Sequence, residues 1–245
     1  MRTTELQSVD WEFGNFILGA FGRDTEGDEL VWDPDHGSEE WQRFLTRTGK
    51  EKLRRIAFED AREFVNKLLG AEIDKGTIDL KTANLPGLPM VGYCRTPGIT
   101  NAGLEGKRMP RLTGYSADGE TRAKVDSICV NVTYNLLFLA FDTLTLDKMI
   151  SVFLYYARYH TEFDVRYAFI DGAIASAKAE LADRQTASFD GASIPTNEGR
   201  LHAAQAIVSV NVPILVGEEI DALPESSEIE WAFQGYCNRN CCGEE

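Results

Sequence analysis

Histidine and acidic side chains are the groups of this chain best suited to acid–base chemistry, because imidazole and carboxylate groups can transfer protons near neutral pH. The chain has three histidines: His36, His160 and His202. His160, Glu162 and Asp164 alternate along the sequence, which would place their side chains on one side of a strand. Nothing nearby in the sequence offers a nucleophile or an oxyanion donor. We therefore do not expect catalysis by these residues.

Two further groups resemble metal ligands without completing a site. Oxygen ligands for a hard cation are offered by Asp33, Asp35 and His36 in WDPDHG. The twelve-residue calcium loop is absent there, so we interpret the segment as an exposed acidic turn. Thiol ligands occur in a C-x3-CC pattern at Cys237, Cys241 and Cys242. This pattern lacks the second CxxC or histidine pair of a zinc site, which favours reduced thiols in a tail.

Nucleotide-binding and nucleophile-elbow motifs are also missing. The sequence contains no GxxxxGK[ST], no GxGxxG after a predicted strand and no GxSxG. We expect no catalytic residue, no cofactor and no metal, and thus no enzyme. The alternative is an enzyme of unrecognised type, which predicts a pocket lined by at least two titratable groups with perturbed pKa values.

The central element of the predicted fold is a strand–helix–strand unit over residues 124–169. Alternating apolar residues from Ile128 to Phe138 indicate a long strand. The i, i+3, i+4, i+7 spacing from Leu146 to Ala157 predicts an amphipathic helix, and alternation from Phe163 to Phe169 predicts a second strand. Such a unit returns the chain to the same sheet, by a right-handed parallel connection if the strands share orientation.

The flanking segments complete an α/β (α+β) fold, with a mixed or antiparallel sheet of long strands flanked by helices. Residues 1–37 predict an acidic extended arm. Ser38 with acids after it indicates a helix N-cap, and spacing from Leu53 to Leu68 predicts a second helix ending at Gly70. Residues 76–120 indicate a long irregular loop with one strand-like patch around Met90–Tyr93. Residues 204–216 predict a strand, in which Pro213 suggests an edge or a bulge.

This organisation gives one core domain over 38–216, between the arm and an acidic tail over 217–245. The formal net charge is −14 at pH 7. Residues 1–40 contain eleven acidic and two basic side chains, and residues 217–245 contain eight acidic and one basic. Such a balance argues against sequence-specific nucleic-acid binding, which needs clustered lysine and arginine.

The loop differs in charge from the two ends, since residues 81–124 carry seven basic and three acidic side chains. Acidic ends and a basic loop would allow head-to-tail association, although solvated surface charge explains the same pattern. No apolar run is long enough to span a membrane and no signal core opens the chain, so we expect a protein made in the cytoplasm. Five cysteines do not suggest a disulfide framework.

The run from Val130 to Tyr167, followed by the strand from Gly199 to Val216, resembles tail terminator proteins of contractile-tailed bacteriophages. The features that carry the resemblance are Tyr134 and Phe138 in a long strand, a helix over Asp147–Tyr156 and an aromatic-rich turn over His160–Tyr167. The patch LPMVGYCR, Leu88–Arg95, resembles the strand and arginine that open the equivalent loop.

The resemblance implies a hexameric ring in the virion neck that caps the tail tube and sheath and joins them to the head–tail connector. Its partners would be copies of itself, tail tube and sheath proteins, and the connector protein. We expect the acidic arms to contact the tube or connector. The predicted interface residues are Arg95, Lys107, Arg108 and Arg111 in the loop, with Trp231 and Phe233 anchoring the tail. A head–tail adaptor or stopper bound to the portal is the structural alternative.

Overall fold

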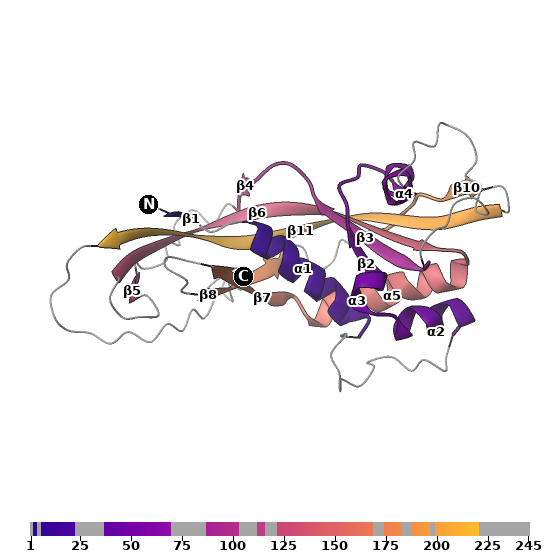
Figure 1. The fold of residues 1–245 in the computed structure, drawn as a ribbon, viewed down its shortest axis with the longest axis horizontal. Helices are drawn as coiled ribbons and strands as arrows, with labels where there is room; N and C mark the ends of the chain where they lie inside the picture. The colour runs from indigo at the N-terminus through magenta and orange to yellow at the C-terminus, as the bar shows by residue number, and fades with distance from the viewer. Residues whose placement is uncertain are drawn as a thin grey trace, which may run out of the picture.

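Two long antiparallel strands, β6 (Arg122–Ala140) and β11 (Gly199–Ile220), form the centre of the fold in this computed structural model. Their backbones pair continuously from His202 opposite Ala140 to Ile220 opposite Arg122. At about 3.4 Å per residue, strands of this length extend for roughly 60 Å or more. Figure 1 shows both strands running along the long axis and continuing past the helices.

The structure describes residues 2–3, 6–22, 37–69, 87–102, 112–115, 122–168, 174–182, 188–196 and 199–220. The helices in these ranges are α1 (Leu6–Ala20), α2 (Glu39–Thr46), α3 (Gly49–Lys52), α4 (Ala61–Leu69) and α5 (Thr143–Tyr159). The other strands are β1 (Arg2–Thr3), β2 (Leu53–Arg55), β3 (Met90–Arg95), β4 (Thr100–Asn101), β5 (Leu112–Tyr115), β7 (Glu162–Ala168), β8 (Ile174–Leu181), β9 (Asp190–Gly191) and β10 (Ile194–Thr196).

The main sheet has the strand order β2-β3-β6-β11-β8-β7, and the shorter strands pair alongside β6 or β11. β2 and β3 are parallel, whereas the other neighbours on this path are antiparallel. The predicted fold class, a mixed sheet flanked by helices, is confirmed. None of the described helices has the length and apolar character needed to cross a bilayer.

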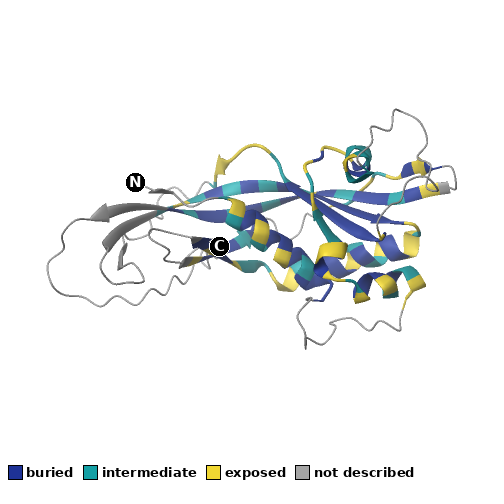
Figure 2. Ribbon diagram, in the orientation of Figure 1, coloured by how far each residue is buried: buried dark blue, intermediate teal, exposed yellow. Residues whose placement is uncertain are grey.

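Helices cover the two faces of the sheet unequally. One hydrophobic cluster joins α1, α2 and α5 to the face that carries Tyr134, Leu136 and Phe138. A smaller cluster joins α4 to the opposite face through Leu137 and Leu139. The run from Leu136 to Ala140 is continuously apolar because both faces are buried at that end. Figure 2 shows this burial concentrated in the central strands and on the sheet-facing sides of the helices.

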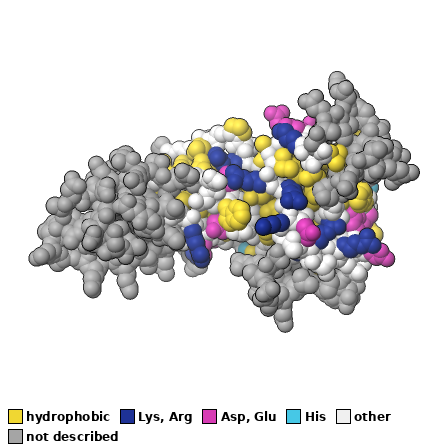
Figure 3. All heavy atoms as spheres, in the orientation of Figure 1, with side chains coloured by type: hydrophobic (Ala, Val, Ile, Leu, Met, Phe, Trp, Pro, Cys, Tyr) yellow, Lys and Arg dark blue, Asp and Glu magenta, His cyan; other side chains and the backbone are white. Residues whose placement is uncertain are grey.

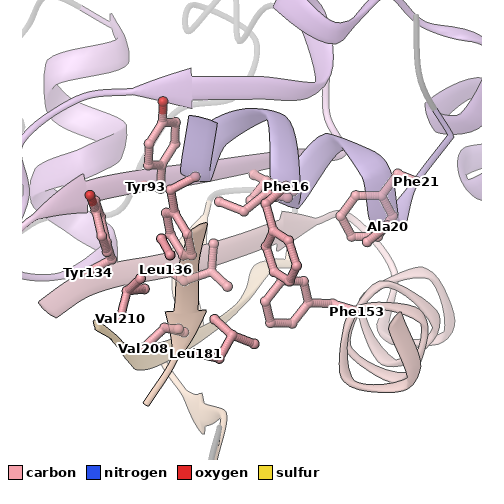
Figure 4. Packing of buried hydrophobic residues seen from close by; sticks show 14 of the residues in the cluster. Phe16, Ala20, Phe21, Tyr93, Tyr134, Leu136, Phe153, Leu181, Val208 and Val210 are labelled. Carbon is pink, nitrogen blue, oxygen red and sulfur yellow. The ribbon is translucent and has the colours of Figure 1, made fainter. Parts of the chain in front are cut away.

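The expectation of an extended arm over residues 1–37 is wrong for Leu6–Ala20, which forms the core helix α1. Val9, Phe13 and Ile17 of α1 are fully buried at helical spacing. Figure 4 shows Phe16 of this helix and Phe21, directly after its end, in one cluster with Tyr93, Tyr134 and Phe153. The sequence pattern was obscured by glycines, which usually disfavour a helix interior.

Those glycines allow close packing of α1. A Cβ added at Gly14 would lie 2.5 Å from the Tyr93 hydroxyl, and one at Gly19 would lie 2.5 Å from the Tyr156 hydroxyl. Both distances are shorter than van der Waals contact, so any larger residue would displace a tyrosine or the helix. The absence of a side chain therefore determines how closely α1 approaches β3 and α5.

The helix predicted from Leu53 to Gly70 is only partly correct. Its first residues form β2, which pairs in parallel with β3 through Leu53 opposite Val91 and Arg55 opposite Tyr93. The helix α4 begins at Ala61 because Asp60 acts as a cap, its side chain accepting a hydrogen bond from the Glu63 N–H at 2.8 Å. Gly70 lies outside the described residues.

The strand–helix–strand unit is present as β6, α5 and β7, and Asp142 caps α5 by accepting from the Thr145 N–H. The two strands do not form a parallel crossover. Three antiparallel pairings separate them in the strand order, so β7 runs opposite to β6. After β6 the chain reverses direction in α5, and β7 continues in the same direction as α5.

Pro213 marks neither an edge nor a bulge in the pairing with β6, because Val212, Pro213 and Ile214 pair one to one with that strand. On its other side, β11 pairs with β8 only at Val210 and Asn211. Proline lacks an N–H donor, which explains why the second ladder stops short of it.

Replacing Gly14 by valine should destabilise the fold because the new side chain would overlap the Tyr93 hydroxyl. Asn15→Val is the matched control, since it introduces the same β-branched residue at the adjacent, exposed position. We expect Gly14→Val to lower the free energy of unfolding by about 1–3 kcal/mol more than Asn15→Val, as overpacking of a core does. Urea unfolding measures both, and equal losses would contradict the packing role of Gly14.

Candidate interaction surface

Most residues singled out from the sequence lie outside the described part of the chain. This applies to the interface candidates Lys107, Arg108, Arg111, Trp231 and Phe233, and to the weaker metal-ligand candidates Asp33, Asp35, His36, Cys237, Cys241 and Cys242. Arg95, His160, Glu162 and Asp164 are described. Across the described residues, no three histidine, cysteine, aspartate or glutamate side chains are grouped as a metal site.

Arg95, at the end of β3, is held within the chain by a buried carboxylate. Its Nε lies 3.0 Å from Oδ1 of Asp10 on α1. The same carboxylate binds Arg55 of β2 at 2.5 Å and accepts a hydrogen bond from the Tyr134 hydroxyl at 2.8 Å. The Asp10 side chain is only 2 % exposed. Arg95 is therefore part of an internal polar cluster that joins α1 to β2, β3 and β6.

The tyrosines of this cluster act as neutral hydrogen-bond donors. The Tyr93 hydroxyl donates to the Asp10 carbonyl at 3.0 Å, and burial raises the pKa of Tyr93 to about 12. Burial, with the neighbouring Asp10 charge second, raises the pKa of Tyr134 still further above its usual value. Both side chains remain protonated around the Asp10 carboxylate, as a buried anion requires.

The alternating residues His160, Glu162 and Asp164 meet α1 at a surface hollow of about 650 Å³, which we call the α1–β7 hollow. Its polar lining consists of Glu12, Asn15, His160, Glu162, Asp164 and Arg166. The structure thus brings the predicted group together with residues of α1 that sequence analysis had assigned to an extended arm. The hollow was missed because it depends on a helix that was not predicted.

The apolar lining of the α1–β7 hollow is aromatic. The Phe16 ring lies 5.3 Å from the rings of both Tyr156 and Phe163, measured between centroids. His160 stacks on Tyr156 with centroids 4.2 Å apart, and Glu162 lies 3.4 Å from Lys178. These contacts give His160 and Glu162 packing and pairing roles within the chain, and they form a hollow with an aromatic lining and carboxylates around it.

Exposed aromatic residues occur beside the hollow. On α1, Trp11 is 66 % exposed and precedes Asn15 by one helical turn. On the last turns of α5, Tyr155 and Tyr159 are 57 % and 65 % exposed, with ring centroids 4.8 Å apart. Tyrosine and tryptophan are enriched in the buried centres of protein interfaces. The hollow and these three residues together form the aromatic surface, the candidate interaction surface of the protein.

A second surface missed by sequence analysis is basic. The segment TRTGKEKLRR, with Arg43 just before it, contains six basic residues and one acidic residue between positions 43 and 55. Lys52 is buried, so the basic ridge consists of Arg43, Arg47, Lys50, Arg54 and Arg55 on α2, α3, β2 and the turns between them. Lysine and arginine side chains spread across the middle of the face in Figure 3.

Part of the basic ridge has a structural role. Arg47 donates hydrogen bonds to the carbonyl oxygens of Gly87, Leu88 and Pro89, holding the segment that leads into β3. Burial lowers the pKa of Arg47 from its usual range. Lys50 is exposed and Arg54 is half-buried, and no ion pair within the described residues engages either side chain. These two cations are available to a partner.

The sequence matches no protein-family model and no curated protein.

Glu40 links α2 to the turn between β6 and α5. Its carboxyl accepts hydrogen bonds from the backbone N–H groups of Phe141 at 2.7 Å and Asp142 at 3.0 Å. Burial, together with a hydrogen bond to the Asp142 side chain, raises the pKa of Glu40 from 4.5 to about 7. The pKa of Asp142 is lowered, first by the hydrogen bond from Glu40. The pair shares one proton at mildly acidic pH, and both groups organise the start of α5.

Removing the Asp10 charge should destabilise the whole fold. Asp10→Asn would leave two arginines without their counter-ion. We expect a loss of roughly 2–4 kcal/mol in the free energy of unfolding. This is somewhat less than is usual for breaking a fully buried ion pair, because both arginines are partly hydrated. Chemical denaturation provides the measurement, with Glu12→Gln on the same helix as control. A loss no larger than that of the control would show that the cluster contributes little.

The raised pKa of Glu40 should make stability depend on pH. Between pH 4.5 and about 7 the folded chain holds a proton on Glu40 that the unfolded chain has released. The Glu40 contribution to stability is therefore complete below pH 4.5 and is lost as pH rises through 7. Glu40→Gln should show a smaller decrease in Tm from pH 5 to pH 8 than the wild type. Glu39→Gln changes an exposed residue one position away, and its Tm should depend on pH as that of the wild type does. If the Tm of Glu40→Gln also fell with pH as steeply as that of the wild type, the raised pKa of Glu40 would be refuted.

Proposed function

We propose that this protein is a self-associating structural subunit, a tail terminator that forms a ring at the neck of a contractile-tailed bacteriophage. The observation that carries the self-association is the aromatic surface. Trp11, Tyr155 and Tyr159 are more than half exposed, although large aromatic side chains in such a group are usually covered by a partner. Assignment to the phage neck rests on the sequence resemblance.

The sheet provides further support for an assembly role. β6 and β11 continue past the helical body (Figure 1), with the short strands β4 and β5 paired along β6 and β1 paired along β11, so a neighbouring molecule would meet this end through the faces of the sheet. The rigid Asp10 cluster fixes α1 against the sheet, so the aromatic surface is held in one arrangement before association. Preorganisation reduces the entropy cost of binding.

Association through the aromatic surface should be lost when its exposed tyrosines are truncated. We expect the wild type to form a closed oligomer, six copies by the resemblance, and Tyr155→Ser/Tyr159→Ser to remain monomeric at concentrations where the wild type assembles. Aromatic residues at the centre of an interface typically contribute more than about 1 kcal/mol each to the free energy of binding, which is about a fivefold or larger change in the dissociation constant for each residue. Native mass spectrometry and light scattering report the oligomer.

Ile207→Ser is the control, because Ile207 is 64 % exposed on β11 and lies outside the aromatic surface. It should assemble as the wild type does. A wild type that is monomeric at every concentration would overturn self-association. Negative-stain images of the protein mixed with tail tubes or with portal rings test its position in the virion. Rings at the ends of tubes support a terminator, whereas binding to portal rings alone supports the adaptor alternative.

A further inference from the structure

The α1–β7 hollow and the basic ridge carry opposite charges on different parts of the chain. The hollow presents Glu12 and Asp164, together with Glu162, which is paired with Lys178, against a single arginine in its lining, Arg166. The ridge presents several cations, of which Lys50 and Arg54 have no ion-pair partner among the described residues. Complementary potentials of this kind select partners and fix their orientation.

The chemistry of the hollow suits an alkylammonium or guanidinium group. Phe16, Tyr156 and Phe163 make part of its lining aromatic, with Phe16 almost fully buried and Tyr156 stacked on His160, and cations bind aromatic rings favourably when they are partly desolvated. Carboxylates beside the rings can accept charge-assisted hydrogen bonds from the same cation. A volume of about 650 Å³ has room for more than one long side chain. An acidic partner would be repelled.

The basic ridge of the same chain does not occupy the hollow, because α1 lies between them. One side of α1 faces β2 and β3, where Asp10 binds Arg55 and Gly14 approaches Leu53. Glu12, Asn15 and Phe16 line the hollow together with β7. Lys50 and Arg54 can therefore enter a hollow only on another molecule.

We propose that the hollow of one copy receives Lys50 and Arg54 of the next copy, so that the subunits associate head to tail. This inference rests on the proposed function and specifies the contact through which the ring forms. A contact between two different surfaces repeats from copy to copy, and it closes into a ring when the rotation allows. The exposed Trp11, Tyr155 and Tyr159 would then surround a charged centre that is shielded from water.

A charge exchange between the two surfaces tests the contact. Glu12→Lys/Asp164→Lys should prevent assembly, and so should Lys50→Glu/Arg54→Glu, each weakening association at least tenfold. An equimolar mixture of the two variants should regain assembly as an alternating ring, because the reversed hollow of one variant receives the reversed ridge of the other and the remaining contacts are those of the wild type. The quadruple variant carries both reversed surfaces and should regain assembly on its own. Light scattering with the full chain measures association, and thermal unfolding confirms that each variant is folded.

Two single reversals serve as controls for the change in total charge. Asp190→Lys and Arg200→Glu alter exposed residues of β9 and β11 outside both surfaces, and each should assemble as the wild type does. Assembly of either double variant at wild-type concentration would overturn the proposal while leaving ring formation intact. A folded quadruple variant that stays monomeric would also overturn it. A monomeric wild type would remove the proposed function as well.

Discussion

The buried Asp10 carboxylate is the interaction on which the arrangement of the other elements depends. An anion this far from water is tolerated only when cations and hydrogen-bond donors surround it, and here they come from three strands: Arg55 on β2, Arg95 on β3 and Tyr134 on β6. The carboxylate can contact all three partners in only one position, so these contacts fix both the axial position and the rotation of α1. Trp11 is thereby turned to solvent and Glu12 to the hollow.

The same helix connects the two ends of the strand order. The Asp10 side of α1 meets β2 and β3, while the rings of Phe13 and Phe16 lie 6.1 and 5.3 Å from Phe163 of β7. A sheet whose outer strands both contact one helix must curve around it. The hollow beside β7 follows from this curvature, since it lies where the helix, the end of α5 and the outer strand meet.

Sequence periodicity predicted the elements whose apolar residues repeat without interruption, namely β6, α5, β7 and most of β11. It failed for α1, where Gly14 and Gly19 resemble helix breakers although they allow tyrosine hydroxyls to approach closely. It failed for β2 because three residues of a strand fit the spacing of a helix equally well. His160, Glu162 and Asp164 were noticed as a group, but their companions Glu12 and Asn15 become neighbours only through tertiary contact, which no local pattern encodes.

The distribution of charge also bears on the symmetry of an assembly. A two-fold dimer places a surface against its own copy, so a contact centred on the α1–β7 hollow would bring Glu12, Glu162 and Asp164 of both chains together. Like charges brought out of water repel strongly, and although Lys178 pairs with Glu162, the lining offers only Arg166 to compensate Glu12 and Asp164. A contact between unlike surfaces avoids this repulsion. The electrostatics therefore favour a cyclic arrangement over a symmetric pair for any assembly that uses the aromatic surface.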